Sequence, residues 1–424
     1  MNHEIDEQQP STTIKFLTFN TWGLKYVSKS RRERLKSIAA KINNDHLNYD
    51  IIALQEIWCQ EDWEYIDRST SINYPFRRNF YSGIISGPGL AILSKFPIED
   101  TFLYKFPING RPSAFWRGDW YVGKSIAVTL LKPIDNNTSP LAILNSHMHA
   151  PYSLKGDAAY ECHRSCQAWD FAKISKILTK AGYAVVIVGD LNSRPGSLPH
   201  KFLTLETGLI DSWEQLKGVQ NLNEIQLLSP DLQIEIGGTT CDSILNTWRQ
   251  NCQPNEACRL DYALIDPLKL QTLDAKVTFV EQIPGIGSYS DHFAYHCTLK
   301  LLPFNNNNNS NKQKIPIQNI DRKSYLNQML NLLDDYSTTS LGQKFWRLFH
   351  FWASIIILII ILIVTSFTSF HASWSSIFWV LLAIIISITG LIDGLIGYLF
   401  GNKELRALEE IKQQVQDSIK TIID

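Results

Sequence analysis

The sequence predicts an α/β protein in which two mixed β-sheets pack against each other between helices, followed by two membrane-spanning helices. Residues 14–302 alternate short strands with helices, and several predicted strands follow one another with no helix between them. This pattern indicates mixed sheets rather than one parallel sheet. Residues 345–400 instead hold two long apolar stretches, which are typical of a membrane hairpin.

The strands and helices of residues 14–302 are predicted from hydrophobic periodicity. Residues 14–20 alternate apolar and polar side chains, residues 30–42 have helical spacing, and residues 50–55 form a short apolar run. Further strands are expected at residues 89–94, 124–131, 141–146 and 185–188, and the clearest helix at residues 158–178. We expect this region to form one catalytic domain.

Residues 303–344 and 401–424 flank the apolar stretches. The first segment is expected to be a polar linker, because it begins with a run of asparagines at 305–309 and has no apolar period there. The second segment repeats leucine, isoleucine and valine three or four residues apart, which predicts an amphipathic helix. This tail helix could pair with another helix, lie on a membrane, or pack on its own protein.

The apolar stretches of residues 345–400 are long enough to cross a bilayer. Residues 351–370 carry no charge, and residues 372–400 carry only Asp393. A buried helical pair in a soluble core fits less well, since soluble helices rarely stay apolar all round for so long. Basic residues lie outside the hairpin and none lies in its short connection: Lys344, Arg347, Lys403 and Arg406. The positive-inside rule then places the catalytic domain and the tail in the cytosol, and we expect the endoplasmic reticulum or another endomembrane.

The overall charge is nearly balanced. The chain has 424 residues, with 40 Lys and Arg against 41 Asp and Glu and a net charge of −1, so no broad basic surface for nucleic acid is expected. Seven cysteines in a chain whose first 13 residues lack an apolar signal region favour reduced thiols over a disulfide scaffold.

Polar side chains gather at the ends of the predicted strands. They are Asn20, Glu56, His147, His149, Asp190, Asn192, Asp261, Asp291 and His292. Any one of them alone is more typical of a turn or a cap. Together, carboxylate, amide and imidazole groups form the set that metal-assisted hydrolysis at phosphorus requires, and hard oxygen ligands favour Mg²⁺ over zinc.

Seven segments make the resemblance to a known family specific. FNTWGL, DIIALQEIW, GLAILSKFPI, NSHMHAPY, VGDLNSRP, LDYALID and SDHFAYH occur in the order seen in the endonuclease/exonuclease/phosphatase superfamily. The chain resembles the neutral sphingomyelinase branch, which includes the fungal inositol phosphosphingolipid phospholipases C, through the segment YECHRSCQAW at 160–169 and the C-terminal pair of apolar spans. The resemblance implies a DNase I-like, four-layer α/β/β/α sandwich.

The resemblance also implies a role for each site residue. Glu56 would be the main Mg²⁺ ligand, with Asn20 beside it holding the metal or a phosphoryl oxygen. Asp190 would orient the attacking water, Asn192 would contact the phosphate, and His292 would be the general base, oriented by Asp261 or Asp190.

A further histidine would bind or protonate a phosphoryl oxygen. We assign this role to His149 rather than His147, because the family's histidine directly precedes a small residue and a turn, here Ala150-Pro151.

Residues 118–125 satisfy the pattern of a nucleotide-binding P-loop. A true P-loop opens a helix, whereas the residues that follow here are β-branched and predict a strand. The resemblance implies instead that Asp119 and Lys124 matter for activity. Lys124 would bind the substrate phosphate or an anionic activating lipid, with Asp119 as its exchangeable partner; a turn with a surface ion pair is the alternative.

Three functions therefore compete. The first is a membrane-embedded, Mg²⁺-dependent phospholipase C that hydrolyses sphingomyelin or an inositol phosphosphingolipid to ceramide and a phosphorylated head group. The second is a membrane-anchored nuclease or inositol-phosphate phosphatase of the same superfamily. The third is a catalytically silent tether, which fits less well because Asn20, Glu56 and His292 are all present.

Overall fold

The computed structural model describes residues 12–44, 46–303 and 319–422. The predicted asparagine run at 305–309 lies outside these residues. The chain divides into two units, each described by itself below. The catalytic unit comprises Met1–Asn109 and Arg117–Gln318, and the helical unit comprises Gly110–Trp116 and Asn319–Asp424.

The catalytic unit contains two six-stranded sheets. The first has the strand order β11-β14-β1-β2-β4-β3 and the second has the order β5-β6-β7-β8-β10-β9. The first sheet consists of β1 (Thr13–Asn20), β2 (Ile51–Gln55), β3 (Phe76–Asn79), β4 (Ala91–Ser94), β11 (Leu270–Thr278) and β14 (Ala294–Leu301). The second consists of β5 (Ile98–Lys105), β6 (Ser125–Leu131), β7 (Leu141–His147), β8 (Ala184–Asp190), β9 (Ile210–Asp211) and β10 (Asp261–Ile265). A short ribbon pairs β12 (Gln282–Ile283) with β13 (Gly287–Ser288). β1–β2 and β7–β8 are parallel and the other named pairs are antiparallel, so the predicted mixed sheets are confirmed.

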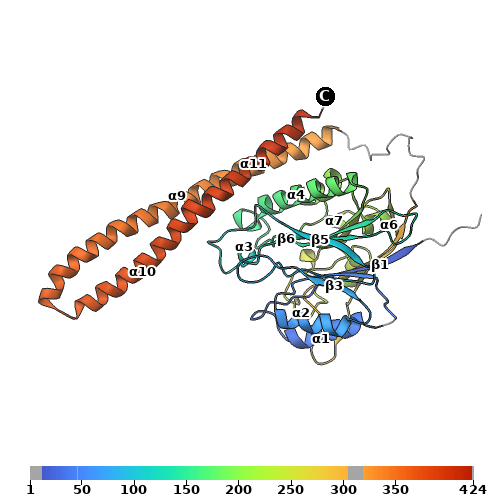
Figure 1. Ribbon diagram of the computed structural model, residues 1–424, viewed down its shortest axis with the longest axis horizontal. Helices are drawn as coiled ribbons and strands as arrows, with labels where there is room; N and C mark the ends of the chain where they lie inside the picture. Colours follow the sequence, from blue (N-terminus) through green and yellow to red (C-terminus); the bar gives the residue numbers. More distant parts are fainter. Residues whose placement is uncertain (1–11, 45, 304–318, 423–424) are drawn as a thin grey trace, which may run out of the picture. The chain divides into compact units, whose positions relative to one another are not determined.

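Helices cover the outer face of each sheet. α1 (Arg31–Ile42) and α2 (Gln60–Thr70) lie on the first sheet, and α4 (Glu161–Lys180) lies on the second (Figure 1). Shorter helices are α3 (Asp119–Val122), α5 (Leu198–Lys201), α6 (Ser212–Lys217), α7 (Leu222–Ile225) and α8 (Pro230–Glu235), with η1 (Asp157–Ala159), η2 (Phe202–Glu206) and η3 (Pro254–Glu256). The four-layer α/β/β/α sandwich is therefore confirmed.

Strand alternation divides the core into two apolar layers. Along β1, Ile14 and Phe16 pack between the sheets with residues of β7 and β8, whereas Leu17 and Phe19 pack with residues of α1 and α2. Successive side chains of a strand point to opposite faces, so both faces of this strand are buried. Asn20, two residues beyond Thr18, shares the inter-sheet face of Ile14 and Phe16.

The segment at 118–125 is not a P-loop. Only the single turn of α3 (Asp119–Val122) forms there, Gly123 has a φ of 68°, and the chain then enters β6 at Ser125. The predicted strand after this motif is confirmed. No long helix follows whose N-terminus could hold a nucleotide phosphate.

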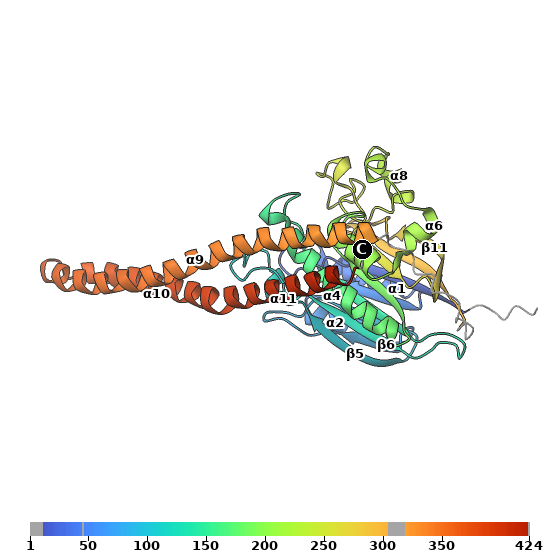
Figure 2. The same cartoon turned by 90° about the horizontal axis from the view of Figure 1, so that it is seen from above.

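The helical unit consists of three consecutive helices. α9 (Asn319–His371) and α10 (Ser375–Leu395) lie side by side in Figure 1 and in Figure 2, and α11 (Gly401–Lys420) follows a π-helical turn, η4 (Ile396–Phe400). The expected polar linker is thus helical from Asn319 onward. Its Leu326, Met329 and Leu333 are buried, as are Leu408, Ile411 and Val415 of α11, which packs on α9. The amphipathic tail is therefore packed on its own protein.

A polar cluster joins α9, α11 and the 110–116 segment inside the helical unit. The hydroxyl of Tyr336 donates to Glu404 Oε1 at 2.8 Å and accepts from Arg111 Nε at 2.9 Å. Ser340 Oγ donates to Glu404 Oε2 at 2.7 Å. These contacts hold the 110–116 segment, α9 and α11 together within the helical unit.

Two helices are long and apolar enough to cross a membrane, Asp321–His371 and Ser375–Lys420. Most of their apolar side chains are exposed, including Ile356 at 60% and Leu362 at 69%. A core helix of a soluble protein would have buried these side chains, so their exposure favours membrane anchoring. Asp393 accepts from Arg347 and pairs with His350 on the neighbouring helix, so the one acid of the second stretch is neutralised within the hairpin.

Candidate active site

The strand ends of both sheets bring the predicted site residues together. In the second sheet His147 on β7 and Asp261 on β10 both lie opposite Asp190 on β8. On β8 and β10 the residues two and four positions away belong to the inter-sheet core, and on β7 the residue four positions away does, so these three side chains also face the first sheet. Asn20 faces them from β1, and the two sheets therefore form the two walls of one site.

Asn20 links the carboxylates of Glu56 and Asp190. Its Nδ2 donates to Glu56 Oε1 and to Asp190 Oδ2, each at 3.0 Å, while its Oδ1 accepts from the backbone N–H of Trp22 at 3.0 Å. In this arrangement the amide nitrogen faces the carboxylates. Asn20 thus positions both acids, and its expected role as a metal ligand stays a prediction.

Glu56 is held in an unusual backbone conformation directly after β2. Its φ is 61°, a value that costs a non-glycine residue free energy and is often found at functional sites. Trp58 Nε1 donates to Glu56 Oε2 at 3.2 Å, which fixes the second carboxylate oxygen. Burial, and then the charge of Asp291, raise the pKa of Glu56. A buried acid of this kind calls for a compensating cation.

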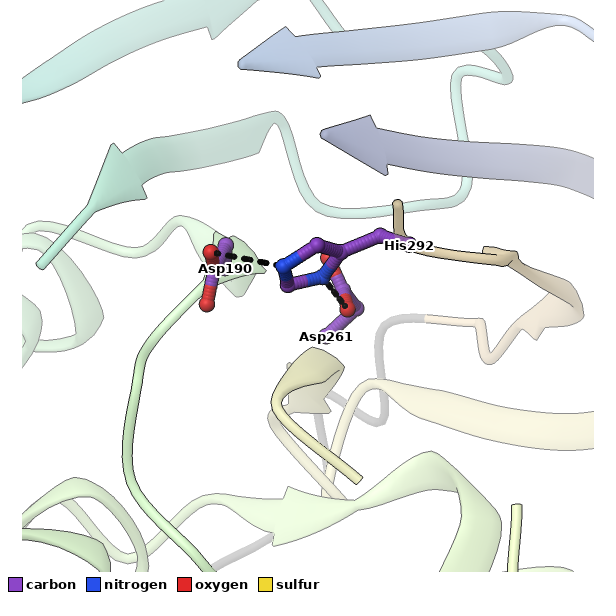
Figure 3. A group of neighbouring side chains, drawn as sticks. All are labelled: Asp190, Asp261 and His292. Atoms are coloured by element: carbon purple, nitrogen blue, oxygen red, sulfur yellow. Dashed lines mark hydrogen bonds and ion pairs between the residues drawn. The ribbon is translucent and has the colours of Figure 1, made fainter. Parts of the chain in front are cut away.

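His292 lies between two carboxylates. Its Nδ1 is 2.9 Å from Asp261 Oδ2, and its Nε2 faces Asp190 Oδ2 at 3.7 Å (Figure 3). Thr240 Oγ1 accepts from the backbone N–H of Asp261 at 3.2 Å and so supports this pair from behind. The arrangement fixes the ring with Nε2 toward the centre of the site, as a general base requires.

The structure brings His147, rather than His149, to Glu56 and Asp190. The Nε2 of His147 lies 3.5 Å from Asp190 Oδ2 and 3.9 Å from Glu56 Oε1. The two histidines do not point the same way, because β7 ends at His147 and Met148 then bonds through its backbone N–H to Asp190.

His149 belongs to a neighbouring cluster that contains the Asp119–Lys124 pair. Its ring stacks on Tyr160 at 4.0 Å, and its Nε2 lies 3.7 Å from Asp119 Oδ2. Asp119 Oδ1 is 3.2 Å from Lys124 Nζ, and Asp119 Oδ2 accepts from the Tyr152 hydroxyl at 2.6 Å. The side chains of Asp119 and Lys124 are only 6% and 2% exposed, so the alternative of a surface ion pair does not describe them.

One backbone carbonyl connects this cluster to the catalytic centre. Lys124 Nζ and Asn192 Nδ2 both donate to the carbonyl oxygen of Met148 at 3.0 Å. Asn192 has a φ of 46°, and its backbone N–H donates to Asp190 Oδ1 at 3.1 Å. Lys124 therefore supports the segment between His147 and His149, through its bonds to Asp119 and to the Met148 carbonyl.

The two central imidazoles differ in their electrostatic surroundings. Burial would lower the pKa of His292, but the acidic groups of Cys241, Asp261 and Asp190 raise it well above its ordinary value. Burial, and then the charge of Lys124, lower the pKa of His147 well below its ordinary value. Burial also raises the pKa of Asp190 to about 7. Such separation of neighbouring titrating groups is typical of acid–base sites.

At these strand ends, two sets of described side chains could hold a metal ion. One oxygen or nitrogen from each of Asp190, Asp261 and His292 lies within 4.8 Å of the others, and all three residues are buried. In this set, however, the Nδ1 of His292 and Oδ2 of Asp261 already bond to each other. Glu56 with Asp190 forms the second set, which offers hard carboxylate oxygens alone and so suits a hard cation better.

Sequence reasoning missed two contributors to the site. Trp58 contacts the Glu56 carboxylate, and Arg249 Nη2 pairs with Asp291 Oδ2 at 2.7 Å. The position of Trp58 two residues after Glu56 was a usable signal. Arg249 had none, because it lies in an irregular loop 42 residues before its partner.

Comparisons with known proteins identify the family of the chain. A model of the Endonuclease/Exonuclease/phosphatase family matches residues 17–292. An inositol phosphosphingolipids phospholipase C of Saccharomyces cerevisiae is 56% identical, over 98% of this chain and 92% of the relative. Its counterpart from Schizosaccharomyces pombe is 35% identical, over 95% and 94%.

A solved structure supports the fold alone. The crystal structure of D. rerio TDP2 complexed with a single-strand DNA product has a TM-score of 0.50 and 16% identity, and it covers 68% of this chain and 100% of that chain. The sequence relatives, by contrast, are similar along nearly the whole chain, the apolar helices included. The chain belongs to the inositol phosphosphingolipid phospholipase C and neutral sphingomyelinase branch of the endonuclease/exonuclease/phosphatase family.

Proposed function

We propose that the protein is a membrane-anchored, Mg²⁺-dependent phospholipase C that hydrolyses a sphingophospholipid to ceramide and a phosphorylated head group. The observation that carries this proposal is the His292–Asp261 pair facing the Glu56–Asn20–Asp190 group across the two sheets. The names of the two fungal relatives supply the substrate class, because both are inositol phosphosphingolipids phospholipases C.

His292 would act as the general base. Water attacks phosphorus and gives one proton to Nε2 of His292, while Asp261 stabilises the ring by accepting from Nδ1. Asp190, 3.7 Å from the same Nε2, would orient that water. The bond between phosphorus and the ceramide oxygen then breaks, and this oxygen leaves with the electron pair and takes up a proton from solvent, while His292 returns its proton to solvent.

The remaining polar groups would stabilise the phosphoryl oxygens. His147 lies near Oδ2 of Asp190 and the backbone N–H of Asn192 bonds to its Oδ1, and both side chains can donate to these phosphoryl oxygens as negative charge develops. Glu56 would hold Mg²⁺, with Asp190 and Asn20 beside it. When bound, this ion stabilises negative charge on the phosphoryl oxygens and opposes the effect of the carboxylates on the pKa of His292.

The Asp119–Lys124 pair would position the segment that follows β7. Lys124 is buried and bonds to Asp119 and to the Met148 carbonyl. An activating anionic phospholipid would therefore have to replace Asp119 as the ion-pair partner of Lys124. The substrate would reach the site from the membrane in which the α9–α10 hairpin is anchored, so no nucleic acid is proposed as a partner.

Ceramide release tests the reaction and its metal dependence. Full-length protein in mixed micelles with sphingomyelin or inositol phosphoceramide should release ceramide with Mg²⁺ and none with EDTA. Glu56→Gln should lower kcat at least about 100-fold, since metal-ion stabilisation is worth several kcal/mol. The matched control, Glu61→Gln on the exposed face of α2, should keep full activity. Full activity of Glu56→Gln would contradict the metal assignment, and nuclease activity without ceramide release would favour the second function.

The two histidines after β7 can be separated by parallel substitutions. His147→Asn should lower kcat about 10²- to 10³-fold, because it removes a donor to the developing phosphoryl charge. His149→Asn should lower it less than about tenfold, the scale of one lost hydrogen bond. The opposite order of these two effects would restore the role first assigned to His149.

Substitution of Lys124 tests the proposed lipid response. Wild-type activity should rise when phosphatidylserine is added to the micelles. Lys124→Ala should lose both basal activity and this response, because the Met148 carbonyl loses its support. The double variant Asp119→Asn/Lys124→Met removes both charges and so leaves no unpaired buried charge. The control is Lys132→Ala, which replaces an exposed lysine directly after β6. A normal response of the double variant would remove the proposed role.

Protease protection tests the proposed topology. In sealed endoplasmic reticulum vesicles, protease added outside should digest the catalytic domain and a C-terminal epitope tag without detergent, because the basic residues around the hairpin predict a cytosolic position for both. A luminal marker protein should stay intact. Protection of either part would contradict the proposed orientation.

A further inference from the structure

A pocket of about 350 Å³ lies beside the proposed catalytic centre within the catalytic unit. Its walls are the 151–154 segment, the start of α4, the segment after β8, and residues near Asp242. The volume is within the range of small-molecule sites, which starts at roughly 300 Å³. The roles proposed above use only one of the residues that line it, Asn192.

The backbone connects this pocket closely to the reacting groups. Asn192, which lines it, bonds through its N–H to Asp190. Leu260, on another wall, directly precedes Asp261, and its carbonyl accepts from the N–H of Leu191 at 2.9 Å. A group that stays bonded to phosphorus during the reaction could therefore extend into the pocket.

Two arginines give the pocket its main hydrogen-bond donors. Arg164 is only 8% exposed, and its Nε has no hydrogen-bond partner among the described residues. Arg194 is half-buried and donates from Nη2 to the carbonyl of Glu256 at 2.9 Å. Within the described part of the chain, neither guanidinium forms an ion pair with a carboxylate. Both therefore keep donors available for a ligand.

Acceptors line the same pocket. The hydroxyls of Ser153, Ser193 and Ser197 each donate to a backbone carbonyl, which leaves their oxygens free to accept. The carboxylates of Glu161 and Asp242 add further acceptors. A ligand with several hydroxyl groups can use such a mixture, because each hydroxyl both donates and accepts.

The same lining is a poor match for a quaternary ammonium group. Such cations are bound by several aromatic faces, and Tyr152 is the one aromatic residue among those that line the pocket. Its hydroxyl is already bonded to Asp119. The guanidinium of Arg164 and that of Arg194 would also repel a positive charge.

We propose that this pocket binds the polyol head group of an inositol-phosphate sphingolipid, with Arg164 and Arg194 donating to its hydroxyl oxygens. The proposal rests on the phospholipase C function proposed above and assigns its head-group preference to this pocket. Arg194 is the residue to test, since it is half-buried and its loss removes a donor without opening the core.

The experiment compares two lipids on the same full-length protein. With Mg²⁺ in mixed micelles, Arg194→Ala should lower kcat/KM for inositol phosphoceramide about 10- to 100-fold, the scale of a lost charged hydrogen bond. Its kcat/KM for sphingomyelin should change less than about threefold. Glu161→Gln, an exposed variant that does not threaten folding, should shift the preference in the same direction. Arg68→Ala, on the exposed face of α2, is the matched control and should change neither value.

Inhibition by free head groups separates a polyol site from a general anion site. Inositol 1-phosphate should inhibit the wild type more strongly than phosphocholine or inorganic phosphate does, and Arg194→Ala should remove this difference. Equal losses on both lipids, or equal inhibition by all three anions, would overturn the pocket assignment while leaving the phospholipase function in place. Absence of ceramide release from either lipid by the wild type would instead overturn the proposed function itself.

Discussion

The amide of Asn20 is the contact on which the rest of the site depends. It joins Glu56, which follows β2 in the first sheet, to Asp190, which ends β8 in the second. Both acids are buried, and the hydrogen bonds from one Nδ2 hold their oxygens close together where repulsion would separate them. Without this bridge the two sheets could still pack, but the carboxylates would not converge on one point.

Burial raises the free-energy cost of bringing these carboxylates together, and it also shifts the pKa values of the groups in the site. The pKa of Glu56 and that of Asp190 are raised, while that of His147 is lowered. A bound cation lowers the raised pKa values of the two carboxyl groups, because it stabilises their ionised forms. An imidazole between carboxylates is suited to accept a proton from water. The apolar layers that stabilise the sandwich therefore also bury the carboxylates, and this burial favours binding of a metal ion.

Much of the fold could be predicted because hydrophobic alternation is a local signal. It predicted β1, β2, β6 and β8 nearly to the residue, and the ends of β1 and β8 located Asn20 and Asp190. The choice between His147 and His149 was harder, since it depends on the turn at Met148, which bonds to Asp190 in another strand. The helix from Asn319 was missed because an asparagine run masked a helical period that begins only after it.

Contacts made by irregular loops could not be predicted at all. Arg249 reaches Asp291 from a loop without periodicity, and the pocket at Arg164 and Arg194 forms only when segments distant in sequence meet. The central claim concerns the metal, and Mn²⁺ binding to the full-length protein, followed by electron paramagnetic resonance, tests it most directly. The account predicts that Glu56→Gln weakens Mn²⁺ binding by more than about tenfold while His292→Asn leaves it nearly unchanged. Loss of binding in His292→Asn with normal binding in Glu56→Gln would contradict it and would place the ion with Asp190, Asp261 and His292.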